Sequence, residues 1–90
     1  MTDVAELLLE LHGLLHQLRE RLDDVASWQQ EVQTSEWLVE QHGDDKELKN
    51  RLRYSREMLA AAEREANETK QRIVCLLKDV ASEVMSWSSS

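Results

Sequence analysis

The stretch EQHGDDKE, residues 40–47, decides how this chain folds. Gly43 fits the left-handed position just beyond a helix end, which glycine adopts without a Cβ clash. Asp44 can then cap the N-terminus of a second helix, with Glu47 three residues later as in a capping box. A helix end and a helix start this close together leave room only for a tight reversal. The alternative is one continuous helix through Gly43, at a cost of about 1 kcal/mol relative to alanine.

The residues before this stretch have the pattern of a long helix. Thr2 or Asp3 can cap its N-terminus, and Glu6 completes a box-like arrangement with Asp3. Apolar residues recur every seven positions, at Val4, Leu11, Leu18, Val25, Val32 and Val39. This row is flanked on one side by Leu8, Leu15 and Leu22, followed by Gln29 and Glu36, and on the other by Leu7, Leu14 and Trp28. The periodicity predicts a helix over about residues 3–42.

The residues after the stretch repeat the pattern and predict a second helix over about residues 45–87. Its seven-residue row is Leu52, Leu59, Ala66, Ile73, Val80 and Trp87. A companion row holds Leu48, Ala62 and Leu76, interrupted by Ser55, Thr69 and Glu83. The chain has no proline and two glycines, as is typical of long helices. We therefore expect an all-α fold and one helical-hairpin domain, residues 1–90, with its turn at about 43–44.

Charge and volume predict that the two helices lie antiparallel. Reversal at Gly43 brings acidic residues of each helix near basic residues of the other. The acidic and basic sets are Glu31, Glu36 and Glu40 with Lys46, Lys49, Arg51, Arg53 and Arg56; Glu63, Glu65 and Glu68 with Arg19 and Arg21; Asp23 and Asp24 with Arg64; and Glu6 and Glu10 with Arg72 and Lys78. Trp28 falls near Met58–Ala62, where three alanines leave room for an indole. Exposed ion pairs contribute only ~0–1 kcal/mol each, so they select the register of a coiled-coil-like hairpin.

The end of the hairpin away from the turn carries more apolar residues than one helix–helix seam can hide. The candidate partner-binding residues are Leu7, Leu8, Leu11, Leu14, Leu15, Leu18, Ile73, Val74, Leu77 and Val84. We expect this open end to associate with other helices, giving a four-helix bundle as a homodimer or with a partner's helices. The alternative is a thick seam whose outer leucines are half covered by long charged side chains.

Other chemistry has little support in the sequence. The net charge of −7 argues against nucleic acid as a partner. His12, His16 and Glu20 share a helical face without a clear fourth ligand, so we expect no metal and no cofactor. Cys75 stands in an apolar run, which favours a packed thiol. Trp37 can either anchor a partner or pack against the turn.

Function follows from the interaction surface. No nucleophile–base pair, glycine-rich phosphate loop or carboxylate dyad is present, so we expect no enzyme activity and no small-molecule substrate. The apolar runs are too short to span a bilayer, and a single cysteine suits a reducing compartment, so we expect an intracellular, cytoplasmic protein. The sequence predicts an adaptor or structural subunit that oligomerises or binds partner helices. The alternative is a small helical chaperone or inhibitor that masks an apolar helix of a client protein.

Overall fold

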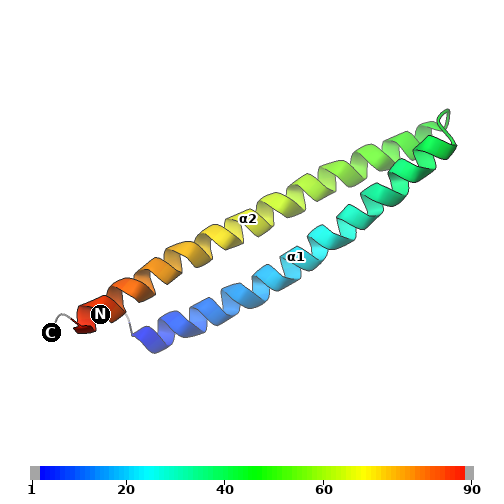
Figure 1. The fold of residues 1–90 in the computed structure, drawn as a ribbon. Coiled ribbons are helices and arrows are strands. Elements are labelled where there is room, and N and C mark those ends of the chain that lie inside the picture. Colours follow the sequence, from blue (N-terminus) through cyan, green and yellow to red (C-terminus); the bar gives the residue numbers. More distant parts are fainter. Residues whose placement is uncertain (1–2, 89–90) are drawn as a thin grey trace.

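The computed structural model describes residues 3–88 and consists of two long helices (Figure 1). Helix α1 spans Val4–Gln41 and helix α2 spans Lys46–Ser88. Helices account for 94% of the described residues, and none of these residues lies in a strand. The all-helical fold with two long helices is therefore confirmed.

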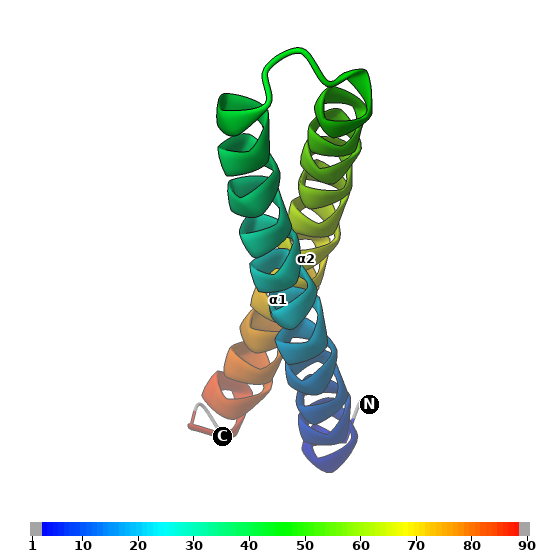
Figure 2. The same cartoon turned by 90° about the vertical axis from the view of Figure 1, so that its right-hand side faces the viewer.

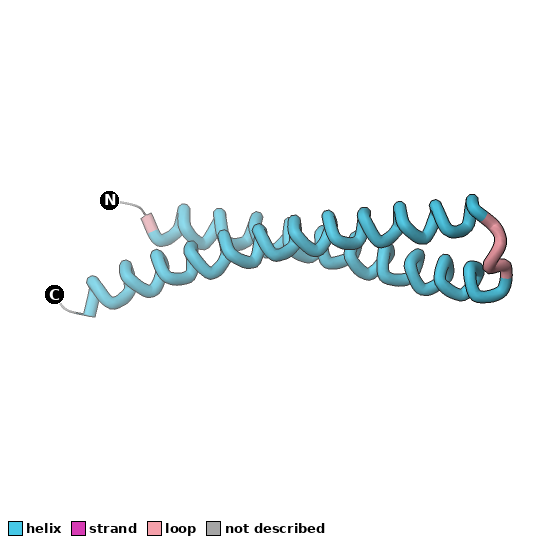
Figure 3. Tube along the Cα trace, turned by 90° about the horizontal axis from the view of Figure 1, so that it is seen from above, coloured by secondary structure: helices cyan, strands magenta, loops and turns pink. Residues whose placement is uncertain are grey.

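The two helices run antiparallel, so that both ends of the chain lie at one end of a rod and the turn at the other (Figure 1). The molecule measures 70 × 16 × 15 Å. Seen at right angles to the first view, the helices cross (Figure 2), and from above they overlap near their middle (Figure 3). This wrapping is the geometry of a coiled coil. Within residues 3–88, neither helix has a stretch long and apolar enough to cross a membrane.

The caps show why the helices begin where they do. The Asp3 side chain accepts the N–H of Ala5 at 3.1 Å, which confirms Asp3 as a cap of α1; Thr2, the other candidate, lies outside the described residues. Helix α2 is capped by Asp45 rather than Asp44. One carboxylate oxygen of Asp45 accepts the N–H of Glu47 at 2.9 Å and that of Leu48 at 3.4 Å.

The turn does not use the left-handed glycine that the sequence suggested. Gly43 has no positive φ, so that expectation was wrong. His42 leaves the helical region at φ −134° and ψ 58°, while its N–H still donates to the carbonyl of Leu38. The N–H of Asp45 then donates to the carbonyl of His42 at 3.0 Å, which closes the reversal. Because His42 makes the bend, Gly43 needs no special backbone conformation.

The seam between the helices is built from two rows on each helix. The buried or half-buried apolar rows of α1 are Val4, Leu11, Leu18, Val25, Val32 and Val39, and Leu7, Leu14 and Trp28. On α2 the corresponding residues are Leu52, Leu59, Ala66, Ile73 and Val80, and Leu48, Ala62 and Leu76. The predicted seven-residue rows therefore face each other through almost their whole length. The row Leu8, Leu15 and Leu22 is exposed, because α1 turns its other flanking row into the seam.

Polar side chains occupy several inner positions of this seam. Ser35, Ser55 and Thr69 are each 1% exposed. The hydroxyls of Ser55 and Thr69 donate to the carbonyls of Arg51 and Glu65, one turn earlier, at 2.8 and 3.1 Å. The hydroxyl of Ser35 has no partner in the structure. These layers contribute less apolar burial than the leucine-rich layers of the open end.

The register is set by contacts between the helices. Arg51 pairs with Glu31 at 2.6 Å, and Arg56 pairs with Glu36 at 3.3 Å, as the charge pattern predicted. Arg21 instead donates to the backbone carbonyl of Glu65 at 3.1 Å. No other ion pair between α1 and α2 is present within residues 3–88, so the remaining predicted charge pairs do not form.

The indole of Trp28 packs against an aromatic ring of α2 that the sequence pattern did not single out. Its neighbour is Tyr54, edge-on, with the ring centroids 5.9 Å apart. Tyr54 lies one helical turn closer to the hairpin turn than the expected Met58–Ala62.

Candidate helix-binding surface

The open half of the hairpin exposes large apolar side chains beside the seam. The exposed fractions are 51% for Leu8, 49% for Leu15, 42% for Leu22, 44% for Val74, 47% for Leu77 and 46% for Val84. We call these six residues the apolar flank. Single exposed leucines are ordinary on a protein surface, but six at helical spacing on two adjacent helices form a contiguous strip.

The two helices contribute to the same flank. Glu36 and Arg56 each directly follow an inner serine, Ser35 or Ser55, and they pair with each other. Residues that directly follow these inner positions therefore meet on one side of the hairpin, as expected for an antiparallel coiled coil.

Seven-residue steps from the Glu36–Arg56 pair describe this side toward the open end. The first step places Gln29 opposite Glu63, and the second places Leu22 opposite Lys70. The third step places Leu15 opposite Leu77, and the fourth places Leu8 opposite Val84. Beside the seam, this side thus carries an ion pair near the turn and only apolar residues at its last two levels, Leu15 with Leu77 and Leu8 with Val84.

The opposite side of the hairpin carries mostly polar and charged residues. It holds the Glu31–Arg51 pair near the turn. Three seven-residue steps from that pair place Glu10 opposite Arg72, and both line one groove at the open end together with Leu14 and Cys75. Because both residues line the same groove, the groove agrees with a register that persists to the open end.

Charge on this second side is almost entirely negative in the open half. Its exposed acidic residues, which we call the acidic flank, are Glu6, Glu10, Glu20, Asp24, Glu68 and Asp79. Arg72 is the basic residue among them. The open half therefore has one apolar side and one acidic side, and only the apolar side resembles an interface between helices.

The ten residues predicted to bind a partner divide into two groups. Leu7 and Ile73 are buried in the seam, and Leu11, Leu14 and Leu18 are half-buried there. The other five are exposed and belong to the apolar flank: Leu8, Leu15, Val74, Leu77 and Val84. Leu22 completes the flank and was missing from the prediction. Its seven-residue spacing from Leu15 could have revealed it.

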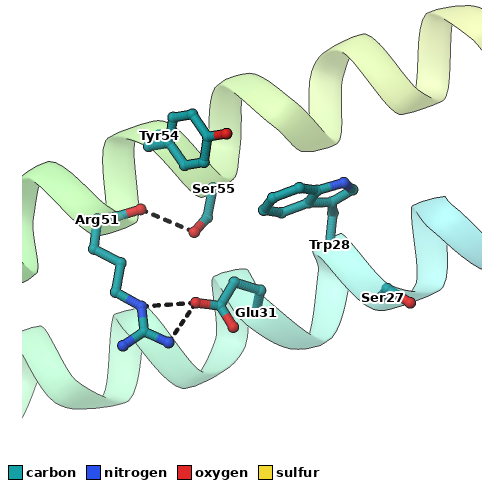
Figure 4. A pocket seen from close by; sticks show the side chains of 6 residues that line it. All are labelled: Ser27, Trp28, Glu31, Arg51, Tyr54 and Ser55. Atoms are coloured by element: carbon teal, nitrogen blue, oxygen red, sulfur yellow. Dashed lines mark hydrogen bonds and ion pairs between the residues drawn. The ribbon is translucent and has the colours of Figure 1, made fainter.

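A second concave feature lies near the turn, on the polar side. It is an open groove of about 480 Å³ lined by Ser27, Trp28, Glu31, Arg51, Tyr54 and Ser55 (Figure 4). The two aromatic rings form its apolar wall, and the Glu31–Arg51 ion pair closes one end. Arg51 already pairs with Glu31, and the rings of Trp28 and Tyr54 already pack edge-on. The packing of the two helices is therefore sufficient to explain the groove.

The remaining candidate residues have simpler roles. His16 lies 3.3 Å from Glu20 one turn along the same helix, and both side chains are about 70% exposed. Within residues 3–88, no three histidine, cysteine or acidic side chains are placed to hold a metal ion. Cys75 is exposed, so the expectation of a packed thiol was wrong: the seam is filled by its neighbours Ile73 and Leu76. Trp37 is 58% exposed on the outer face of α1.

Comparison with known proteins adds no relatives. No protein-family model, curated protein sequence or solved structure matches this chain.

Proposed function

We propose that this chain is a non-enzymatic helix-binding module, an adaptor or structural subunit that covers its apolar flank with other helices. The supporting observation is the pairing of exposed leucine and valine side chains across α1 and α2 in the open half only. Adding two helices along this side completes a four-helix bundle, because each hairpin contributes two neighbouring helices to a shared core. The added helices come from a second copy of the chain or from another protein.

The size of the flank sets what a partner must provide. Full burial of a leucine or valine side chain contributes ~1.5–3 kcal/mol, so covering its exposed half contributes roughly 1 kcal/mol. The six residues of the flank then contribute about 6 kcal/mol. Association itself costs on the order of 4–15 kcal/mol. A micromolar complex, about 8 kcal/mol, therefore requires a partner with a matching apolar face of its own.

The test compares two doubly substituted variants that carry the same added charge. Leu8→Glu with Leu15→Glu places two carboxylates on the apolar flank. Leu9→Glu with Met85→Glu places two at the same end of the rod, on outer positions that are 72% and 70% exposed. Both variants keep the seam intact, so circular dichroism should show the same helix content.

Association is measured in two ways: by sedimentation of the protein alone, and by binding to a labelled amphipathic peptide with leucines at heptad spacing and uncharged border residues. We expect the wild type and the outer variant to associate in at least one assay and the flank variant in neither. The proposal fails if the wild type stays at its chain mass of 10.5 kDa and binds no peptide. It also fails if the flank variant associates as well as the wild type.

A further inference from the structure

In the open half, the charged side chains on the side of the apolar flank are basic, and the next position of this side toward the turn is Glu63, opposite Gln29. In the open half, the exposed positions on this side beyond the apolar residues include Arg19 of α1 and Lys70 of α2. No acidic residue lies on this side between residues 4 and 26 of α1 or between 67 and 88 of α2. All the acidic residues of the acidic flank lie across the seam. A chain of net charge −7 therefore presents its apolar flank within a basic border.

The basic border is unused by the hairpin itself. Neither Arg19 nor Lys70 forms an ion pair within residues 3–88. Nearer the turn, the matching position on this side is the Arg56–Glu36 pair, where the hairpin supplies its own carboxylate. At Lys70 the facing residue is Leu22, so the hairpin supplies none.

We infer that the occupant of the apolar flank is a partner helix whose apolar stripe is bordered by carboxylates that face Arg19 and Lys70. This inference rests on the proposed function and names the chemistry of the partner. Charges at the rim of such an interface select the partner and its orientation more than they add affinity. A neutral or basic helix with the same apolar residues leaves both cations facing a partner that offers them no carboxylate.

A second copy of this chain is a poorer match than an acid-bordered helix. When two apolar flanks face each other, Arg19 and Lys70 meet a side that has no carboxylate in the open half. Each copy also carries seven net negative charges, which repel. The acidic flank of a second copy has the right charge but lacks the leucine row that the six flank residues require.

The experiment uses three synthetic helices with identical leucine heptads and with glutamate, glutamine or lysine at the border positions. Binding of each labelled peptide to the full chain is followed by fluorescence anisotropy at low and high salt. The acidic peptide forms two favourable charge pairs with Arg19 and Lys70, whereas the basic peptide forms two unfavourable ones. At low salt the Kd of the basic peptide should therefore be about tenfold or more above that of the acidic peptide. The difference should shrink at high salt.

Two variants assign the effect to the border residues. Arg19→Glu with Lys70→Glu should reverse the order of the acidic and basic peptides. Lys46→Glu with Lys49→Glu changes the net charge equally at the turn end and should preserve the order. The inference is overturned if the basic peptide binds as well as the acidic one, or if the protein forms dimers and binds no peptide; both results leave helix binding in place. No dimer and no binding to any peptide overturns the proposed function instead.

Discussion

Ser35 and Ser55 form a natural pair for measuring what an unpaired hydroxyl costs in this seam. Both are 1% exposed, and both stand at inner positions of a helix. The Ser55 hydroxyl donates to the carbonyl of Arg51 at 2.8 Å, whereas the Ser35 hydroxyl has no partner. Replacing each by alanine removes one oxygen and leaves the Cβ in place, so the two variants differ mainly in the hydrogen bond.

The expected free energies of unfolding follow from this difference. Ser35→Ala removes a buried unsatisfied group, which stabilises by ~1–3 kcal/mol, and alanine adds roughly 0.5 kcal/mol of helix propensity. Ser55→Ala gains the same propensity but loses a bond with a net contribution of ~0.5–1.5 kcal/mol. We therefore expect Ser35→Ala to stabilise and Ser55→Ala to be neutral or slightly destabilising, a gap of about 2 kcal/mol. For a domain of this size the gap corresponds to roughly 8 °C or more in Tm.

The assay is urea unfolding followed by circular dichroism, with all proteins at one concentration because association would shift the midpoint. Equal urea midpoints for the two alanine variants would refute the conclusion that the Ser35 hydroxyl is unpaired and the Ser55 hydroxyl is bonded. That result would mean that the Ser35 hydroxyl is satisfied in solution, by the carbonyl of Glu31 one turn earlier or by water. Ser35→Val is a useful third variant, since a loss of stability there would show that the site has no room for two methyl groups.

Three further predictions concern the hairpin itself. Gly13→Ala should raise the free energy of unfolding by ~0.5–1 kcal/mol, because an added Cβ at this helical position meets nothing within 4 Å. Gly43→Ala should be nearly neutral, since the new Cβ lies 3.6 Å from the Val39 carbonyl oxygen in ordinary contact; a loss above about 1 kcal/mol would indicate a left-handed turn residue. A double-mutant cycle on Glu31 and Arg51 should give a coupling of ~0.3–1 kcal/mol that falls with salt, and zero coupling at low salt would mean that the 2.6 Å contact is not populated.

The sequence was sufficient for the helices because their signals are local and repeated. Seven-residue rows ending near Val39 and beginning near Leu48 bracket the turn from both sides. The Asp3 cap and the pairing of Glu31 and Glu36 with Arg51 and Arg56 depend only on neighbours in sequence or on the antiparallel register. Such features follow from periodicity and charge without knowledge of packing.

The details that sequence could not supply depend on rotation and on backbone angles. On α1, Leu8 and Leu15 are as apolar as Leu7 and Leu14, so hydrophobicity does not say which row enters the seam. The structure turns Leu7 and Leu14 inward. In the turn, the chain bends at His42 rather than at a left-handed Gly43. The cap of α2 is Asp45 rather than Asp44, and the sequence could not distinguish them because both aspartates are equally suitable caps.

The change along the apolar side separates the two halves of this molecule. Near the turn, Glu36 and Arg56 are exposed to solvent and pair with each other. Charged pairs of this kind are typical of positions beside the seam of a coiled coil. At the open end the equivalent positions are Leu8 and Val84, whose apolar side chains form no hydrogen bonds with water. The half whose seam buries Leu7, Ile73 and Leu76 is therefore also the half with uncovered leucines. Under the proposed function this is consistent: a partner covers a region that is already folded, so binding need not include the cost of ordering the hairpin.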